Sequence, residues 1–357
     1  MKKILFLIII LLIPWPVMAF SSNAKGAILM DTDSRRVLYA KNAHYVQSVA
    51  SISKIMTAIV AIENANIKKT VTVGDEILKA YGSGIYVKQG EKISLEDLLY
   101  GLMLRSGNDA ALVIAKNVSG STEKFVEKMN ETAKKIGMTD TTFNNPSGLD
   151  EEKGNFSSAY DMALLMSYAM QNETFKTITG TKSHTVETNK NVYKWTNKNK
   201  LLTRYKYTTG GKTGFTKKAK RTLVTSASKD GLNLTVVTIN DGDDWNDHEA
   251  LYEEAFEKYT AYTILDKGDI SILGETYYKN NTLYLKNDFK YPLLKAETEA
   301  VNLKFKLDKK RNYKTGDKVG MADVYIGDKK IGSESIYVKK EKNKETLWNK
   351  IKSWFDD

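Results

Sequence analysis

The chain of 357 residues contains no cysteine and only three histidines, His44, His184 and His248. Without cysteine, a disulfide framework, a thiolate nucleophile and a cysteine-ligated metal site are all excluded. The histidines are far apart and show no ligand-like spacing, which disfavours a zinc enzyme. A Ser-His-Asp hydrolase is disfavoured as well, although one histidine would suffice for that triad. We therefore expect no metal and no cofactor.

The N-terminal apolar run is too short to cross a membrane. It covers ten residues, Ile4 to Ile13, whereas a spanning helix needs about 20. Lys2 and Lys3 precede the run, and the small-residue exit Val17-Met18-Ala19 follows it. This order is typical of a secretory signal peptide, so we expect residues 1–19 to be removed and the protein to be exported. An uncleaved anchor is the alternative.

The charge balance is basic, with a formal net charge of +11 and a pI of about 9.2. The lysines are spread along the chain, a pattern that suits a solvated surface near anionic lipid or wall polymer. An exported chain rarely meets nucleic acid, so no nucleic-acid partner is expected.

The order of predicted elements indicates an α+β fold for residues 20–262. A β-hairpin is expected at 26–40, a block of helices follows, and strands return at 221–226 and 232–240. The helices are expected at Ser51 to Asn64, Leu95 to Leu104, Asp109 to Val118, Thr122 to Ile136 and Ser158 to Met170.

The acidic stretch Asp241 to Glu249 invites comparison with a calcium loop. Trp245 occupies the place of an oxygen ligand, so the EF-hand pattern fails. We expect instead that Asp247 caps a helix from His248 to Tyr259.

Two smaller units are predicted at the C-terminal end. Short alternating strands separated by turn signals indicate a small β domain at 263–338. They are expected at Ile270-Leu273, Thr282-Lys286, Val301-Leu307, Lys318-Ile326 and Glu334-Val338. The last unit, 339–357, places five large apolar residues within about 120° of a helical wheel, beside lysines. They are Leu347, Trp348, Ile351, Trp354 and Phe355. This pattern favours an amphipathic helix at a membrane surface, and the alternative is a helix packed on its own protein.

Three short motifs follow one another along the chain: Ser51-Ile52-Ser53-Lys54, Ser106-Gly107-Asn108 and Lys212-Thr213-Gly214. Each is weak alone, because Ser-x-x-Lys recurs at Ser22, Ser121 and Ser226, and Lys-Thr-Gly recurs at Lys314.

Context separates the copies. A serine and a lysine three residues apart on a helix lie on one face, so the amine can reach the hydroxyl. Lysine acts as a base only when burial or nearby positive charge lowers its pKa. Ser51 begins an apolar helix that would bury Lys54, whereas the other copies lie in polar or exposed-looking segments. Lys212 follows two glycines and precedes a strand, whereas the pattern around Lys314 predicts a turn.

Together these motifs resemble the signature of penicillin-recognising serine enzymes. Longer stretches resemble the low-molecular-weight penicillin-binding proteins of the D-alanyl-D-alanine carboxypeptidase family. They are Ala50 to Thr57, Ser106 to Ala110, Phe143 to Leu149 and Gly211 to Thr216. The resemblance implies a penicillin-binding/β-lactamase-like domain, in which a helical cluster lies beside a five-stranded antiparallel sheet. It also implies a small β-sandwich-like domain and a C-terminal amphipathic helix.

The resemblance also assigns roles to the motif residues. Ser51 would attack the carbonyl between two D-alanines to form an acyl-enzyme, with Lys54 as base. Ser106 would pass a proton to the departing amine. Asn108 would hold the substrate amide and Lys54, while Lys212 and Thr213 would bind the terminal carboxylate. Gly214 and Phe215 would complete the substrate-binding residues. The backbone N–H groups of Ser51 and Phe215 would form the oxyanion hole.

The partners implied are a peptidoglycan stem peptide ending in D-Ala-D-Ala, β-lactam antibiotics, and a membrane surface contacted through the C-terminal helix. The implied location is peripheral, at the outer face of the cytoplasmic membrane or in the cell wall. One departure is that Lys198 stands where many relatives carry arginine, which leaves its part in carboxylate binding open.

Three alternatives remain. A serine β-lactamase shares the motif types, and Glu151 stands four residues before Asn155 as its deacylating glutamate would. However, Ser106-Gly107-Asn108 replaces the usual Ser-Asp-Asn of class A enzymes. A DD-endopeptidase would use the same residues as a carboxypeptidase. A catalytically silent wall-binding protein is disfavoured because all three motifs are intact.

Overall fold

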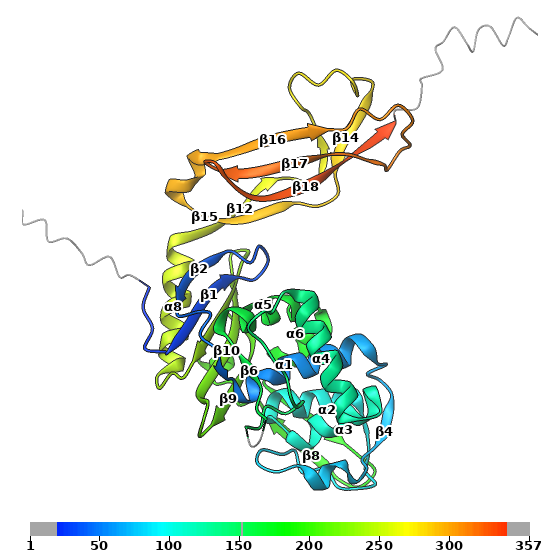
Figure 1. Cartoon of the computed structure of the whole chain (residues 1–357), viewed down its shortest axis with the longest axis vertical. Helices are drawn as coiled ribbons and strands as arrows, with labels where there is room; N and C mark the ends of the chain where they lie inside the picture. The colour runs from blue at the N-terminus through cyan, green and yellow to red at the C-terminus, as the bar shows by residue number, and fades with distance from the viewer. Residues whose placement is uncertain (1–19, 151–152, 341–357) are drawn as a thin grey trace, which may run out of the picture.

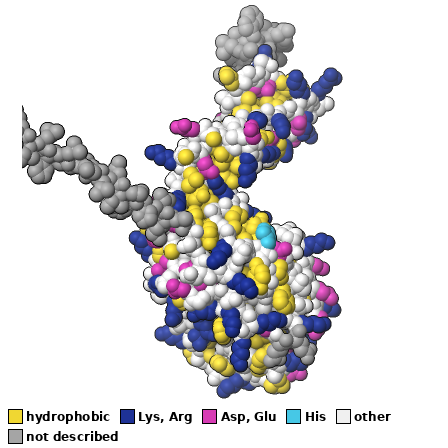
Figure 2. Space-filling model, turned by 60° about the vertical axis from the view of Figure 1, so that its left-hand side comes forward, with side chains coloured by type: hydrophobic (Ala, Val, Ile, Leu, Met, Phe, Trp, Pro, Cys, Tyr) yellow, Lys and Arg dark blue, Asp and Glu magenta, His cyan; other side chains and the backbone are white. Residues whose placement is uncertain are grey.

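The computed structural model describes residues 20–150 and 153–340, which form two lobes (Figure 1). Figure 2 shows the two lobes from another side, with Lys and Arg side chains projecting from both. The predicted signal peptide, residues 1–19, the predicted terminal helix beyond Lys340, and Glu151 lie outside the described residues.

The first lobe is built on a five-stranded antiparallel sheet in the order β2-β1-β11-β10-β9. Its strands are β1 Gly26–Asp31, β2 Val37–Lys41, β9 Thr208–Thr216, β10 Lys220–Lys229 and β11 Leu232–Ile239. Alternate residues of β1 point to opposite faces: Ile28 and Met30 join the core of the helical cluster, whereas Leu29 packs with helix α8. Helices therefore cover both faces of this sheet.

The helical cluster packs on one face of the sheet through α5. Its helices are η1 Ala50–Ser53, α1 Lys54–Asn64, η2 Asp75–Lys79, α2 Leu95–Tyr100, the π-helical turn η3 Gly101–Arg105, α3 Asn108–Ser119, α4 Thr122–Ile136, α5 Ala159–Ala169, α6 Glu173–Gly180 and α7 Leu201–Arg204. Three short antiparallel pairs complete it: β3 Gln47–Ser48 with β6 Phe156–Ser157, β4 Thr70–Thr72 with β5 Lys92–Ser94, and β7 Ser183–Glu187 with β8 Val192–Thr196.

Over residues 259–340, the second lobe consists of β-strands and loops with one 3-10 turn, η4 Lys295–Ala300. A five-stranded antiparallel sheet has the order β13-β14-β18-β17-β16, and β12 pairs with β15 beside it. The strands are β12 Tyr259–Leu265, β13 Gly268–Ile270, β14 Asn281–Leu285, β15 Phe289–Leu294, β16 Val301–Leu307, β17 Lys318–Ile326 and β18 Lys329–Lys340. The fold class expected from the sequence is confirmed for both lobes.

Two local predictions are wrong. The strand expected at Ile270-Leu273 does not form there, because β13 spans Gly268–Ile270 and Leu273 lies in a turn closed by the hydrogen bond from the Glu275 amide to the Ile272 carbonyl. Helix α8 spans Asp244–Lys258, so it begins four residues before His248, and Asp247 lies in its first turn instead of capping it. The Asp247 carboxylate accepts hydrogen bonds from the Ser22 hydroxyl (2.7 Å) and the Asn23 amide (2.6 Å). This carboxylate therefore fixes the N-terminal segment to α8.

Arg36, in the turn after β1, joins the two lobes. Its guanidinium makes a bidentate contact with Glu297, at 2.5 and 2.9 Å, and donates to the Pro292 carbonyl at 2.6 Å. The rings of Tyr259 and Tyr291 each lie 5.3 Å from the guanidinium carbon. Bidentate ion pairs and cation–π contacts require a defined geometry between their partners in addition to stabilising them. Arg36 therefore helps to fix the orientation of the second lobe relative to the first.

Candidate active site

Ser51 lies in the short 3-10 turn η1, directly before α1. The residue before it, Ala50, has a φ of 51°, in the left-handed region that costs a residue with a side chain about 1 kcal/mol or more. The Ser53 hydroxyl donates to the Ala50 carbonyl at 2.8 Å and helps to hold this turn. The serine is thus presented on a strained turn at the start of a buried helix.

Lys54 is the first residue of α1 and is completely buried. Its Nζ lies 3.0 Å from Ser51 Oγ and donates to Asn108 Oδ1 at 2.7 Å and to the Ser147 carbonyl. Burial, and then the charge of Lys212, hold the pKa of Lys54 well below its ordinary value. The arrangement therefore favours the neutral form of an amine that lies in contact with a hydroxyl.

The second motif reaches the same point through Asn108, which begins α3. The other end of its side chain donates to the Tyr81 carbonyl at 2.6 Å. Ser106 is buried and has a φ of 64°, where η3 ends and the chain turns into α3. Asp109, which follows Asn108, accepts hydrogen bonds from the backbone amides of Ile85 and Tyr86. These contacts fix the loop around 81–86 against the motif.

The third motif lies on β9, against the nucleophile. A Cβ placed on Gly214 would lie 3.1 Å from the backbone nitrogen of Ser51, so only glycine allows this approach without a shift. Lys212 is buried, and its Nζ donates to the Thr213 carbonyl at 2.8 Å. Burial, and then the charge of Lys198, lower the pKa of Lys212 to about 7. Phe215, which follows Gly214 on β9, is 65% exposed.

The structure gives the other copies of the motifs structural roles. Ser121 caps α4 by accepting from the Lys124 amide. Ser226 is buried within β10, contrary to the expectation of an exposed segment, and its hydroxyl shares a hydrogen bond with the Thr209 hydroxyl at 2.8 Å. Lys314 stands in a turn, with its amide donating to Asp317 Oδ2 at 2.9 Å. Ser22 binds Asp247, as described above. The copies judged by context as non-catalytic therefore lie outside the site.

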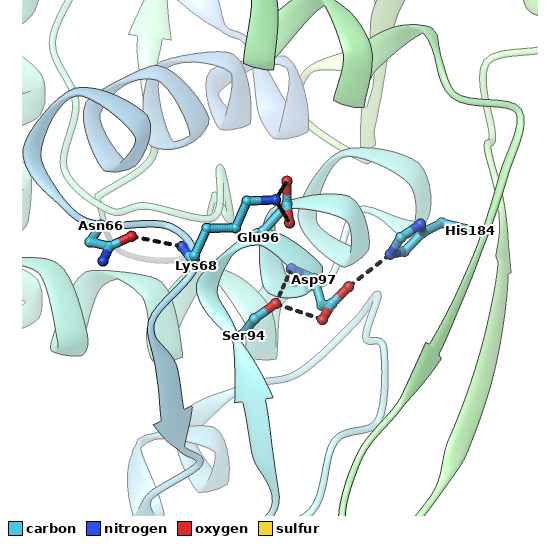
Figure 3. Close-up of polar contacts among 6 residues, drawn as sticks. All are labelled: Asn66, Lys68, Ser94, Glu96, Asp97 and His184. Carbon is cyan, nitrogen blue, oxygen red and sulfur yellow. Dashed lines mark hydrogen bonds and ion pairs between the residues drawn. The ribbon is translucent and has the colours of Figure 1, made fainter.

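The three histidines bind carboxylates or hydroxyls elsewhere in the first lobe. His248 is buried between the hydroxyls of Thr225 and Thr238, and burial lowers its pKa to about 3. His44 pairs with Asp140, and His184 with Asp97, each at 2.8 Å. Figure 3 shows that the Asp97 carboxylate also accepts from Ser94, beside the separate ion pair of Lys68 and Glu96.

No group of three or more acidic or histidine side chains is placed to hold a metal ion within residues 20–150 and 153–340. Over the same residues, no helix combines the length and the apolar character needed to cross a bilayer.

Sequence reasoning missed one part of the site, the Ser147 carbonyl, and left the part played by Lys198 open. The Ser147 carbonyl bonds to Lys54, and the only signal for it was its position inside the stretch Phe143 to Leu149. Lys198 is half-buried, donates to Ser83 Oγ at 3.2 Å, and has a pKa lowered by burial and then by Arg105. Its charge acts on Lys54, which places it beside the cleft.

Comparison with known proteins settles the family. A profile for D-alanyl-D-alanine carboxypeptidase matches residues 16–243, which is more than half of the chain. The chain belongs to this family. A second profile, for the C-terminal domain of penicillin-binding protein 5, matches residues 259–344. The resemblance to low-molecular-weight penicillin-binding proteins is thereby confirmed.

Individual relatives agree with this assignment. The chain is 38% identical over 221 residues to the D-alanyl-D-alanine carboxypeptidase DacF of Bacillus subtilis, covering 60% of this chain and 57% of that one. It is 29% identical to DacD of Escherichia coli, covering 93% of this chain and 90% of that protein. The crystal structure of penicillin-binding protein 5 from Haemophilus influenzae matches 91% of this chain and 99% of its own, with a TM-score of 0.75 and 26% identity.

Proposed function

We propose that this chain is a serine-type D-Ala-D-Ala carboxypeptidase that removes the terminal D-alanine from peptidoglycan stem pentapeptides. The observation that carries the proposal is the 3.0 Å contact between Ser51 Oγ and the buried Lys54 amine. A hydroxyl is a weak nucleophile until an adjacent base accepts its proton, and a lysine with a depressed pKa is such a base. Family membership supplies the reaction to which this pair belongs.

In the acylation step, Ser51 Oγ forms a bond to the carbonyl carbon between the two D-alanines while its proton passes to Lys54 Nζ. The resulting oxyanion is stabilised by the backbone N–H groups of Ser51 and Phe215, a contribution of about 3 kcal/mol or more in such sites. The C–N bond then breaks, and Ser106 relays the proton to the departing amine of D-alanine. Water hydrolyses the ester by the reverse proton path and releases the shortened peptide.

The terminal carboxylate of the substrate would bind to Lys212 and Thr213 on β9. With a pKa of about 7 in the free protein, Lys212 is only partly charged near neutrality, and an anionic partner favours its protonated form. Lys198 adds positive charge on the same side. Asn108 keeps Lys54 in place by accepting from its amine through Oδ1. The Nδ2 group of Asn108 donates one N–H to the Tyr81 carbonyl, and its second N–H would donate to the carbonyl of a substrate amide.

Two further features complete the proposal. We propose that β-lactams acylate Ser51, because they present an amide carbonyl and a carboxylate to the same groups. We also propose that the protein is exported and that residues 339–357 contact a membrane as an amphipathic helix. The support is the arrangement of large apolar residues and lysines in the sequence of that segment.

The three alternative functions have less support. A serine β-lactamase would need a glutamate to activate the deacylating water. The match of residues 259–344 to a penicillin-binding protein C-terminal domain favours a cell-wall enzyme over a β-lactamase. A silent wall-binding protein would not require Lys54, Asn108 and Ser51 to be in contact. A DD-endopeptidase would use the same residues, so product analysis must separate it from a carboxypeptidase.

The deciding experiment is mass spectrometry of a stem pentapeptide and of a crosslinked dimer, each incubated with the protein. We expect the pentapeptide to lose one D-alanine, and Ser51→Ala to abolish both this loss and labelling by fluorescent penicillin. Faster cleavage of the crosslinked dimer would favour the endopeptidase, and sustained turnover of nitrocefin would favour the β-lactamase. A pentapeptide left intact by protein that does bind penicillin would overturn the proposed substrate.

A further inference from the structure

The second lobe ends, away from the first lobe, in a cluster of loops that we call the distal tip (Figure 1). It comprises residues 271–280, 308–318 and 337–340. The register of β14 against β18 pairs Asn281 with Lys340, so the first loop and the end of β18 lie side by side. Strand β16 ends opposite the start of β17, which brings the second loop to the same end.

Leu273 occupies the apex of a tight turn in this tip. The Glu275 amide donates to the Ile272 carbonyl at 3.1 Å, and Gly274 has a φ of 80°, which gives the type II geometry. Leu273 is fully exposed, at 104%. Proline is common at this position of a type II turn, and here a leucine places its whole apolar side chain in water.

A surface of mixed polarity lies beside this turn. A hollow of about 220 Å³ is lined by apolar and aromatic side chains together with the charged Glu275 and Lys309; the apolar and aromatic ones are Ile272, Leu273, Tyr277, Tyr278, Phe305 and Leu307. Tyr277 is 40% exposed and Phe305 is 36% exposed. The tip therefore presents a projecting leucine next to a partly open surface of aromatic, apolar and charged side chains.

The loops of the tip are held together before any partner binds. The Tyr278 hydroxyl donates to the Asp308 carbonyl, and the Tyr277 hydroxyl donates to the Lys310 carbonyl at 2.8 Å. The Lys340 amide donates to Thr315 Oγ1 at 3.0 Å. A preformed surface loses little conformational freedom on binding, so most of its contact energy remains available.

Positive charge surrounds this apolar apex. Eight Lys and Arg residues stand against three acidic ones in the three segments, a net charge of +5. All eight are exposed: Lys279, Lys309, Lys310, Arg311, Lys314, Lys318, Lys339 and Lys340. Figure 2 shows such side chains projecting from the upper lobe.

We infer that the distal tip docks on an anionic lipid bilayer, with Leu273 at the headgroup boundary and the surrounding cations on lipid phosphates. Each Lys or Arg near such a surface strengthens attachment about fivefold, and an inserted leucine adds apolar burial. An anionic wall polymer would satisfy the charges but not Leu273. The inference concerns a surface of the described residues, separate from the segment 341–357, and it does not depend on the proposed activity.

The test is cosedimentation of the full-length protein with vesicles of phosphatidylglycerol and phosphatidylcholine. We expect Leu273→Asp to weaken binding about tenfold, and Lys309→Ala with Lys310→Ala to weaken it about tenfold or more. The matched control is Val192→Asp, because Val192 is 68% exposed on a strand of the first lobe, and it should leave binding unchanged. Residues 341–357 are present in every variant, so their contribution cancels in these ratios.

Penicillin acylation in solution, measured on the same samples, should be equal in all variants and shows that each is folded. The inference is overturned if the parent protein does not bind the vesicles or if Leu273→Asp binds as tightly as the parent. It is also overturned if Val192→Asp weakens binding equally. A soluble polyanion that binds the parent and Leu273→Asp equally, and that displaces the parent from vesicles, would assign the tip to a wall polymer instead.

Discussion

Replacing Lys212 by methionine should stabilise the fold while disabling the site. Burial lowers the pKa of Lys212 from its ordinary 10.5 to about 7. The unfolded chain therefore binds this proton more tightly than the folded protein does, so the penalty on the fold is full below about pH 7 and is lost as the pH rises from 7 to 10.5. At 1.36 kcal/mol for each pKa unit, the penalty is about 4 kcal/mol at pH 7 and about 2 kcal/mol at pH 9.

Methionine fills a similar volume without a charge. Its cost is the hydrogen bond from Nζ to the Thr213 carbonyl, worth about 1 kcal/mol. The free energy of unfolding of Lys212→Met should thus exceed that of the parent by about 3 kcal/mol at pH 7 and about 1 kcal/mol at pH 9. Acylation by penicillin should fall about 10- to 100-fold, because a charge-assisted contact to the carboxylate is lost.

Urea denaturation at pH 7 and pH 9, followed by circular dichroism, measures both differences. Lys194→Met is the matched control, since Lys194 is an exposed lysine on strand β8, and it should change stability by less than about 0.5 kcal/mol. The claim that burial of Lys212 in the cleft disfavours its charged form would be refuted by either of two results. One is a Lys212→Met protein that is less stable than the parent at pH 7, and the other is a gain in the free energy of unfolding that is the same at both pH values.

Two more predictions concern the frame around the site. Gly148→Ala should lose about 2 kcal/mol more stability than Gly137→Ala and most of its penicillin acylation. Both glycines have positive φ, but a Cβ on Gly148 would collide with the Ala50 carbonyl, whereas one on Gly137 meets no described atom within 4 Å; equal losses in thermal unfolding would contradict this. Arg36→Met should leave acylation within about twofold of the parent while broadening the distance distribution in small-angle X-ray scattering, because the Glu297 contact between the lobes is lost. An unchanged distribution would show that other contacts set the arrangement.

The sequence predicted the chemistry better than the geometry around it. Ser51 and Lys54 are three residues apart, so helical spacing alone brings them together. The approach of Asn108 and Lys212 depends on long-range packing, which the motif order indicates only through the family resemblance. Nothing in the local sequence shows that the Ser147 carbonyl completes the environment of the amine.

The missed secondary structure has physical causes as well. Helix α8 begins at Asp244, whose carboxylate binds Arg221 on β10, and a sequence window around the helix cannot show this tertiary contact. Strand β15 contains Pro292, which disfavours a strand from the pattern alone. In the structure β15 pairs only with β12, so the proline sits where its missing N–H is tolerated.

The cleft assigns different ionisation states to chemically identical groups by means of burial and charge. Burial, and then the charges of Lys212 and Lys198, hold the pKa of Lys54 well below its ordinary value and favour its neutral form. Lys212 is also buried, but its pKa of about 7 lies where an incoming carboxylate can drive protonation. Once that carboxylate is bound, its negative charge offsets Lys212, and Lys54 keeps its neutral form largely through burial. The same carboxylate that anchors the substrate therefore limits the charge in the cleft at the moment when Lys54 must accept the proton of Ser51.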